Sequence, residues 1–96
     1  MTTASILGGG RTLVSAAGTA VQLSSTATET NWIKVQAIST NTNAVWVGGS
    51  GVKNDNTGGG MRLTAGEAIP LEVDNLNKVY VDATTNNEGV IYLYGR

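Results

Sequence analysis

Apolar residues alternate with polar ones through much of this chain, and clusters of Gly, Asn and Asp interrupt the alternation. The pattern is densest between residues 42 and 82, where apolar residues alternate with polar and turn residues in segments 45–52, 61–76 and 78–82. Successive side chains of a β-strand point to opposite sides, so a period of two is typical of a strand with one buried face. The pattern therefore predicts short antiparallel strands joined by turns.

The same criteria predict eight short strands along the chain. The segments between them are rich in the residue types that turns prefer. The predicted strands are residues 11–16, 20–24, 32–40, 44–48, 62–65, 68–74, 78–83 and 89–94. Pro70 lies inside one of them and predicts an edge strand or a bulge, because proline lacks a backbone N–H. Eight strands at this spacing indicate an all-β sandwich or barrel.

The first ten residues are predicted to form a flexible N-terminal arm, followed by a single domain over residues 11–96. Gly8, Gly9 and Gly10 are consecutive, and a run of glycines is typical of a hinge because ordering it costs much conformational entropy. Such an arm is either a frayed terminus or a segment that becomes ordered on a partner. In the second case Ile6 and Leu7 are the candidate anchors, with Arg11 at the base of the arm.

All five aromatic residues lie at the strand positions opposite to the aliphatic ones. The aliphatic sets are Ile33, Val35 and Ala37; Val45 and Val47; Ile69, Leu71 and Val73; Val79, Val81 and Ala83; and Ile91 and Leu93. If these sets form the core, the aromatic side chains point outward and make a candidate interface: Trp32, Trp46, Tyr80, Tyr92 and Tyr94. Bulges that switch the alternation, or strands buried on both faces, are the alternative.

Composition disfavours several classes of function. The chain has no His and no Cys, which removes disulfides, thiol nucleophiles, imidazole and thiolate ligands and the usual general base. A net charge of −1 gives no basic field for nucleic acid. The apolar runs are only a few residues long, so no membrane partner is expected.

No cofactor or metal site is predicted, and we expect no enzyme activity. The glycine-rich stretches lack the ending of a phosphate-binding loop. The clusters around Asp55 and Asp74 supply one carboxylate each, fewer than calcium usually requires. A small hydrolase would need a pair of carboxylates across a cleft. The candidates are Glu72, Asp74 and Asp82, which would approach one another only if their strands were neighbours. A hydrolase is therefore the weakest of the three functional hypotheses for this chain.

The chain resembles the small β-sandwich structural proteins of tailed bacteriophages, found as head decoration (cement) proteins and related virion modules. The resemblance covers residues 20–94. It rests on the segments Ala20-Val21-Gln22-Leu23, Trp32-Ile33-Lys34-Val35-Gln36-Ala37, Asn43-Ala44-Val45-Trp46-Val47-Gly48, Leu63-Thr64-Ala65-Gly66-Glu67 and residues 73–83. It implies a jelly-roll-like sandwich that assembles as dimers or trimers and binds across seams between major capsid subunits.

The first functional hypothesis is therefore a decoration protein that binds the outer capsid surface and stabilises the head. Its expected location is the virion, after assembly in the bacterial host cytoplasm. Its expected partners are the major capsid protein and further copies of itself, with a homotrimer favoured over a dimer, and the arm residues would contact the capsid. The alternative is a receptor- or carbohydrate-binding module of a phage fibre, with Trp46 or Trp32 stacked on a sugar ring.

Overall fold

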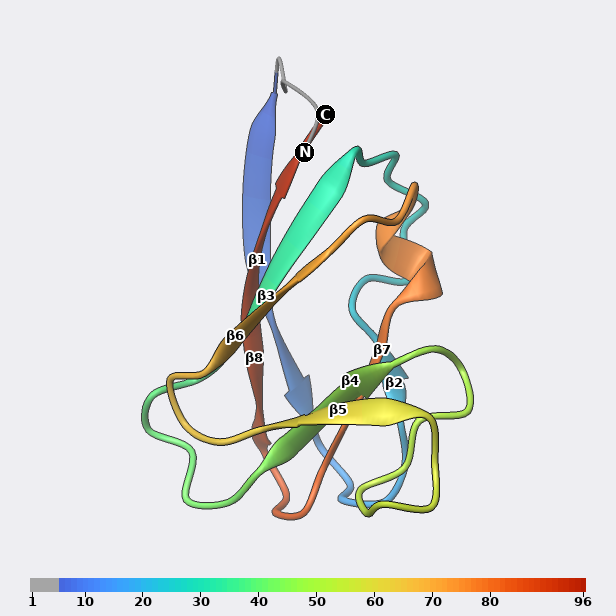
Figure 1. The fold of residues 1–96 in the computed structure, drawn as a ribbon. Coiled ribbons are helices and arrows are strands. Elements are labelled where there is room, and N and C mark those ends of the chain that lie inside the picture. Colours follow the sequence, from blue (N-terminus) through green and yellow to red (C-terminus); the bar gives the residue numbers. More distant parts are fainter. Residues whose placement is uncertain (1–5) are drawn as a thin grey trace.

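The computed structural model describes residues 6–96, which form eight strands and one short 3-10 helix (Figure 1). The strands are β1 (Leu7–Val14), β2 (Val21–Gln22), β3 (Trp32–Ala37), β4 (Val45–Gly48), β5 (Gly60–Leu63), β6 (Ala68–Leu71), β7 (Tyr80–Ala83) and β8 (Glu88–Gly95), and the helix η1 spans Leu76–Lys78. Each predicted strand has its counterpart in this order, which confirms the strand pattern. The helical turn follows β6.

The strands form two four-stranded antiparallel sheets that pack face to face. Sheet A has the order β1-β8-β3-β6 and sheet B the order β2-β7-β4-β5. Successive strands thus alternate between the two sheets, except for β4 and β5, which are neighbours in sheet B. This is the strand order of a jelly roll, so the predicted sandwich class is confirmed.

Aliphatic side chains from both sheets fill the space between them, as most of the alternation predicted. Ile33, Val35 and Ala37 of β3 are fully buried, and they face Val45 and Val47 of sheet B within one cluster. Val79, Val81 and Ala83 join the same cluster, and Ile69, Leu71 and Val73 pack against its edge. The core is therefore built without phenylalanine, from Val, Ile, Leu and Ala.

Strand β8 has the opposite orientation to the one predicted. Val90, Tyr92 and Tyr94 face the core, whereas Ile91 and Leu93 point away from it. Both sets are apolar, so alternation alone does not choose between them. The neighbouring glycines of β1 determine which set faces the core. An added Cβ at Gly10 would lie 2.6 Å from the Tyr92 hydroxyl oxygen, so the tyrosine ring occupies the space that a side chain at position 10 would need.

The glycine triplet is part of a strand, so the predicted hinge at Gly8–Gly10 is wrong. Leu7 pairs with Gly95 and Val14 with Glu88, and the triplet lies inside this continuous antiparallel ladder. Residues 1–5 of the predicted arm lie outside the described residues. The glycines serve the ladder because Tyr92 and Tyr94 cover them, which no side chain at positions 8 or 10 would allow.

Strand β6 confirms the expectation for Pro70. This strand lies at the outer edge of sheet A, with Lys34 of β3 opposite Pro70. A proline is tolerated there because its missing N–H need not pair with a further strand. Within residues 6–96, no helix is long and apolar enough to span a membrane.

Candidate interaction surface

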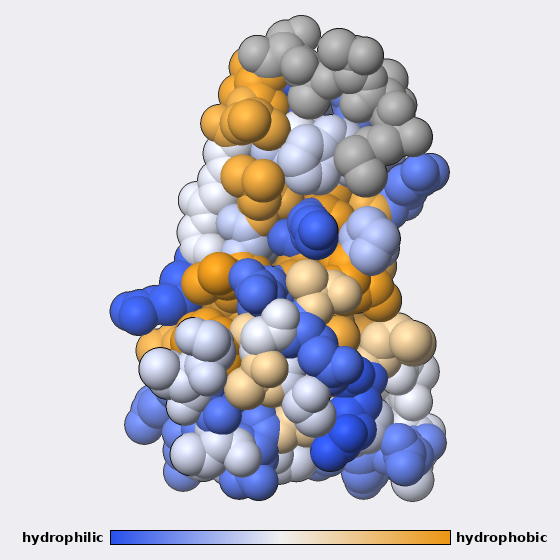
Figure 2. Space-filling view, turned by 60° about the vertical axis from the view of Figure 1, so that its left-hand side comes forward, coloured by the Kyte–Doolittle hydropathy of each residue, from blue (hydrophilic) through white to orange (hydrophobic). Residues whose placement is uncertain are grey.

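The outer face of sheet A carries a patch of exposed aliphatic side chains, which we call the apolar face. Its main members are Leu7 and Leu13 of β1, exposed by 66% and 39%, and Ile91 and Leu93 of β8, exposed by 42% and 45%. They share one face because Leu7 pairs with Gly95, Leu13 with Gly89, and the odd-numbered positions of both strands point outward. Figure 2 shows hydrophobic side chains gathered in the upper part of the molecule, while hydrophilic ones dominate its lower part.

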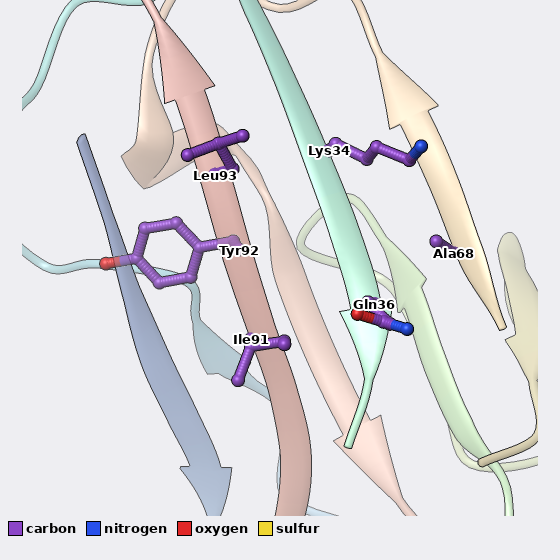
Figure 3. A pocket seen from close by; sticks show the side chains of 6 residues that line it. All are labelled: Lys34, Gln36, Ala68, Ile91, Tyr92 and Leu93. Carbon is purple, nitrogen blue, oxygen red and sulfur yellow. The ribbon is translucent and has the colours of Figure 1, made fainter. Parts of the chain in front are cut away.

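A shallow groove of about 310 Å³ continues the apolar face toward β3 and β6. Its lining comprises Lys34, Gln36, Ala68, Ile91, Tyr92 and Leu93, and Figure 3 shows Ile91 and Leu93 rising from β8 next to Lys34 and Gln36 of β3. The Gln36 amide donates a hydrogen bond of 2.9 Å to the Gly66 carbonyl, so it is held toward the turn. The groove therefore offers aliphatic contact with one cation beside it.

The charges on this face are both positive. Arg11 of β1 lies opposite Ile91, and Lys34 of β3 lies opposite Leu93, so each cation flanks the aliphatic pair on one side. The strand positions that share the face contain no carboxylate. Such a surface suits a partner that presents apolar groups together with Asp or Glu side chains.

The predicted arm residues lie on or beside this face. Ile6 and Arg96 exchange two backbone hydrogen bonds, of 2.8 and 2.9 Å, which extend the β1–β8 ladder. Leu7 and Arg11 are exposed members of the same ladder. The structure thus places Leu7 and Arg11 on one face with Ile91 and Leu93, which the sequence placed in the core, while Ile6 continues the ladder beside that face. The outward orientation of Ile91 and Leu93 follows from the pairing of Gly8 with Tyr94 and of Gly10 with Tyr92. This pairing is known only from the strand register.

The candidate aromatic interface does not form one surface. Tyr92 and Tyr94 face the core, and burial raises the pKa of the Tyr92 hydroxyl, with a smaller contribution from neighbouring Tyr94. Tyr80 is half-buried on the outer face of sheet B. Trp32 is half-buried on the outer face of sheet A, where its indole covers Gly95.

Trp46 points outward as predicted but is only 6% exposed, so the argument that its ring is free to contact a partner or a sugar fails. The loop of residues 49–59 folds back over the outer face of sheet B. Val52 is buried against Gly60 there, and the Asn54 amide donates a 3.1 Å hydrogen bond to the Ala83 carbonyl. Among the described residues, the Trp46 indole nitrogen is the one buried side-chain polar atom without a hydrogen-bond partner.

Asp82 lies on the same covered face and is 1% exposed. Its carboxylate accepts hydrogen bonds from the backbone N–H groups of Gly18 at 3.0 Å and Ala83 at 2.8 Å. Two backbone donors compensate for the loss of water, which explains how a carboxylate is accommodated there. Asp82 therefore holds the loop of residues 15–20 and belongs to sheet B, whereas Glu72 and Asp74 follow β6 of sheet A. The three carboxylates do not converge on one site.

A polar cleft of about 550 Å³ lies near the end of the chain. Its lining residues are Glu29, Thr30, Asn31, Asp74, Asn75, Asn77, Lys78 and Arg96. Its charges pair internally: Lys78 contacts Asp74 at 2.7 Å, and Arg96 contacts Glu29 at 3.4 Å. The Lys78 hydrogen bond lowers the pKa of the Asp74 carboxyl. Within residues 6–96 no three Asp or Glu side chains lie close enough together to hold a metal ion.

Comparison of the chain with protein-family models, with curated proteins and with solved structures found no match.

Proposed function

We propose that this protein decorates the head of a tailed bacteriophage, where it binds the major capsid protein and stabilises the shell. The proposal combines the resemblance of residues 20–94 to phage decoration proteins with the jelly-roll strand order. The observation that carries it is the apolar face. A small protein that exposes four large aliphatic side chains on one sheet has a surface suited to another protein.

The proposed contact places the apolar face against the capsid. Ile91 and Leu93 provide the aliphatic contact, and Arg11 and Lys34 provide charge for carboxylates on the shell. The interface of one copy is small, but many copies on one shell add their contributions, so modest affinity per subunit is sufficient. The outward-aromatic trimer is not supported by Trp46, which is buried, or by Tyr92 and Tyr94, which face the core.

Cosedimentation of the purified protein with mature heads that lack it, on a density gradient, tests this function. We expect saturable binding at a fixed ratio to the major capsid protein. The double variant Ile91→Glu/Leu93→Glu should lose binding, because it places carboxylates in the centre of the apolar face. Met61→Glu is the matched control, since Met61 is 58% exposed but belongs to sheet B.

Thermal unfolding of both variants verifies that they fold. No binding of the unmodified protein to intact heads would overturn the proposal. Equal binding by the double variant and the control would exclude the apolar face as the contact surface.

The second candidate function is a carbohydrate-binding module of a phage fibre. The observation in its favour is the polar cleft, whose asparagine amides at positions 31, 75 and 77 are suitable partners for sugar hydroxyls. Trp32 remains the candidate for stacking on a sugar, although it does not line the cleft. Glycan-array binding that disappears in Trp32→Ala, without binding to heads, would favour this function over decoration.

A further inference from the structure

Strand β1 differs from the other edge strands of the two sheets in length and protection. The edges of sheet B are β2, with two residues, and β5, with four. The second edge of sheet A is β6, with four residues that include Pro70. Natural proteins prevent edge pairing with short strands, prolines and lysines. By contrast β1 has eight residues, with neither proline nor lysine, and contains three consecutive glycines.

The hydrogen-bonding groups at the free edge of β1 follow from its register. Ile6 and Arg96 bond reciprocally, so even-numbered residues of β1 direct their backbone groups toward β8. The odd-numbered residues Leu7, Gly9, Arg11 and Leu13 therefore direct their N–H and C=O groups away from β8. All four residues are exposed, and no other described strand lies on that side.

We propose that β1 pairs antiparallel with β1 of a second copy, about a two-fold axis through Gly10. The two A sheets then join into one sheet of eight strands, four from each copy. In this register Leu7 lies opposite Leu13 of the second copy, and Gly9 lies opposite Arg11. All four odd-numbered residues form hydrogen-bonded pairs, which gives up to about eight backbone hydrogen bonds. This inference does not depend on capsid binding.

Side-chain chemistry selects the register centred on Gly10. It places two exposed leucines in contact on the apolar face, once on each side of the axis. It also places each arginine side chain over a glycine, where no side chain competes for space. A register centred on Arg11 would oppose two like charges, which destabilises a strand pair. A register centred on Gly9 would place Leu7 opposite Arg11 and lose the leucine pair.

The dimer is expected to be weak and concentration-dependent. Stable protein interfaces bury about 1,200–2,000 Å² in total, and one short strand from each copy covers less than this. The apolar faces of the two copies would form one continuous surface across the axis. Pairing would therefore double the apolar surface available to a partner that contacts both copies. A high local concentration of copies would therefore favour the dimer.

Sedimentation velocity from micromolar to millimolar protein, without any capsid, tests the pairing. We expect the unmodified chain to shift from monomer to dimer, and Leu7→Lys/Leu13→Lys to remain monomeric because lysines then oppose each other. Leu7→Lys/Leu13→Glu places Lys opposite Glu in the proposed register and should restore the dimer. Met61→Lys, an exposed substitution in sheet B, should dimerise like the unmodified chain. Circular dichroism verifies that each variant folds.

Three outcomes would overturn the inference. They are a monomer throughout the concentration range, a trimer in place of a dimer, and a dimer that persists in Leu7→Lys/Leu13→Lys. Failure of Leu7→Lys/Leu13→Glu to dimerise better than the double-lysine variant would refute the register. Head binding is measured separately, so failure of the dimer and failure of the decoration function give different results.

Discussion

A methyl group at Gly89 has no space, because it would overlap the carbonyl oxygen of Thr12 on the adjacent strand β1. This contact is with backbone, which cannot rotate away as a side chain can. At Gly8 and Gly10 the nearby atoms belong to tyrosine rings, whose placement over bare backbone fixes which face of β8 is buried. Single glycines thus determine both the spacing of β1 from β8 and the orientation of β8.

Gly89→Ala should therefore destabilise the fold. We expect the free energy of unfolding to fall by about 1–3 kcal/mol, because the strands must separate to admit the methyl group. Urea unfolding measures the change. Gly51→Ala is the control, since nothing lies within 4 Å of the added atom, and its effect should stay within about 0.5 kcal/mol. Equal stability of the two variants would contradict the proposed clash.

Glu88 should contribute stability at neutral pH that is lost in acid. Its carboxylate accepts hydrogen bonds from the Thr42 N–H at 2.6 Å and the Asn43 N–H at 3.1 Å. The Thr42 backbone bond is the main cause that lowers the Glu88 pKa below its ordinary value. The deprotonated form is thus favoured by folding. Its contribution is present above the unfolded-state pKa and disappears as the pH falls through the folded-state pKa.

Glu88→Gln should accordingly lower the Tm at neutral pH, and the difference from the unmodified protein should shrink below about pH 4. Thermal unfolding between neutral and acidic pH measures this. Glu72→Gln, a change of an exposed carboxylate, provides the control for the loss of one charge. A Tm difference for Glu88→Gln that stays constant with pH would show that ionisation of Glu88 is not involved.

Among the elements, the loop of residues 49–59 covers part of sheet B, although its composition is that of an exposed loop. It is rich in Gly, Asn, Asp and Ser, as a solvent-exposed loop would be. It nevertheless covers the outer face of sheet B, with Val52 buried against Gly60 and Asn54 bonded to the end of β7. Sheet B thus buries apolar side chains on both faces, and Val52 and Trp46 are buried on its outer face.

Val52→Ala should loosen this cover. Loss of two buried carbon atoms is expected to cost about 1.5 kcal/mol of unfolding free energy. Acrylamide quenching of Trp46 fluorescence, measured in a Trp32→Phe background, should increase because the loop opens more often. Met61→Ala, at an exposed position on β5, should leave the quenching unchanged. Unchanged quenching in Val52→Ala would show that other residues shield Trp46.

At the scale of the whole molecule, strand pairing joins parts of the chain that are far apart in sequence. The first strand, β1, pairs with the last, β8, and β3 pairs with both β6 and β8. Sheet A is complete only when both ends of the chain have come together. Closing such long loops costs entropy before their contacts form.

Folding should therefore be slow for a chain of 96 residues, in the range of milliseconds to seconds. Stopped-flow refolding monitored by tryptophan fluorescence measures the rate. Gly89→Ala should slow folding if the β1–β8 pair forms in the transition state, and should mainly accelerate unfolding if the pair forms later. Refolding in microseconds would contradict the expectation that long-range pairing limits the rate.

The sequence by itself determined the class of fold, the number of strands and their approximate positions along the chain, the choice between an edge strand and a bulge at Pro70, and most of the core. These follow from local causes: alternation fixes which residues of β3, β4 and β7 share a face, and turn residues fix where strands end. The tertiary structure alone decided that β8 turns Ile91 and Leu93 outward, that Gly8–Gly10 lie in a strand, and that a polar loop buries Trp46. The first two depend on a neighbour distant in sequence, because a strand with two apolar faces is oriented by the space that the opposite strand leaves. The third depends on how the chain after β4 folds back over sheet B.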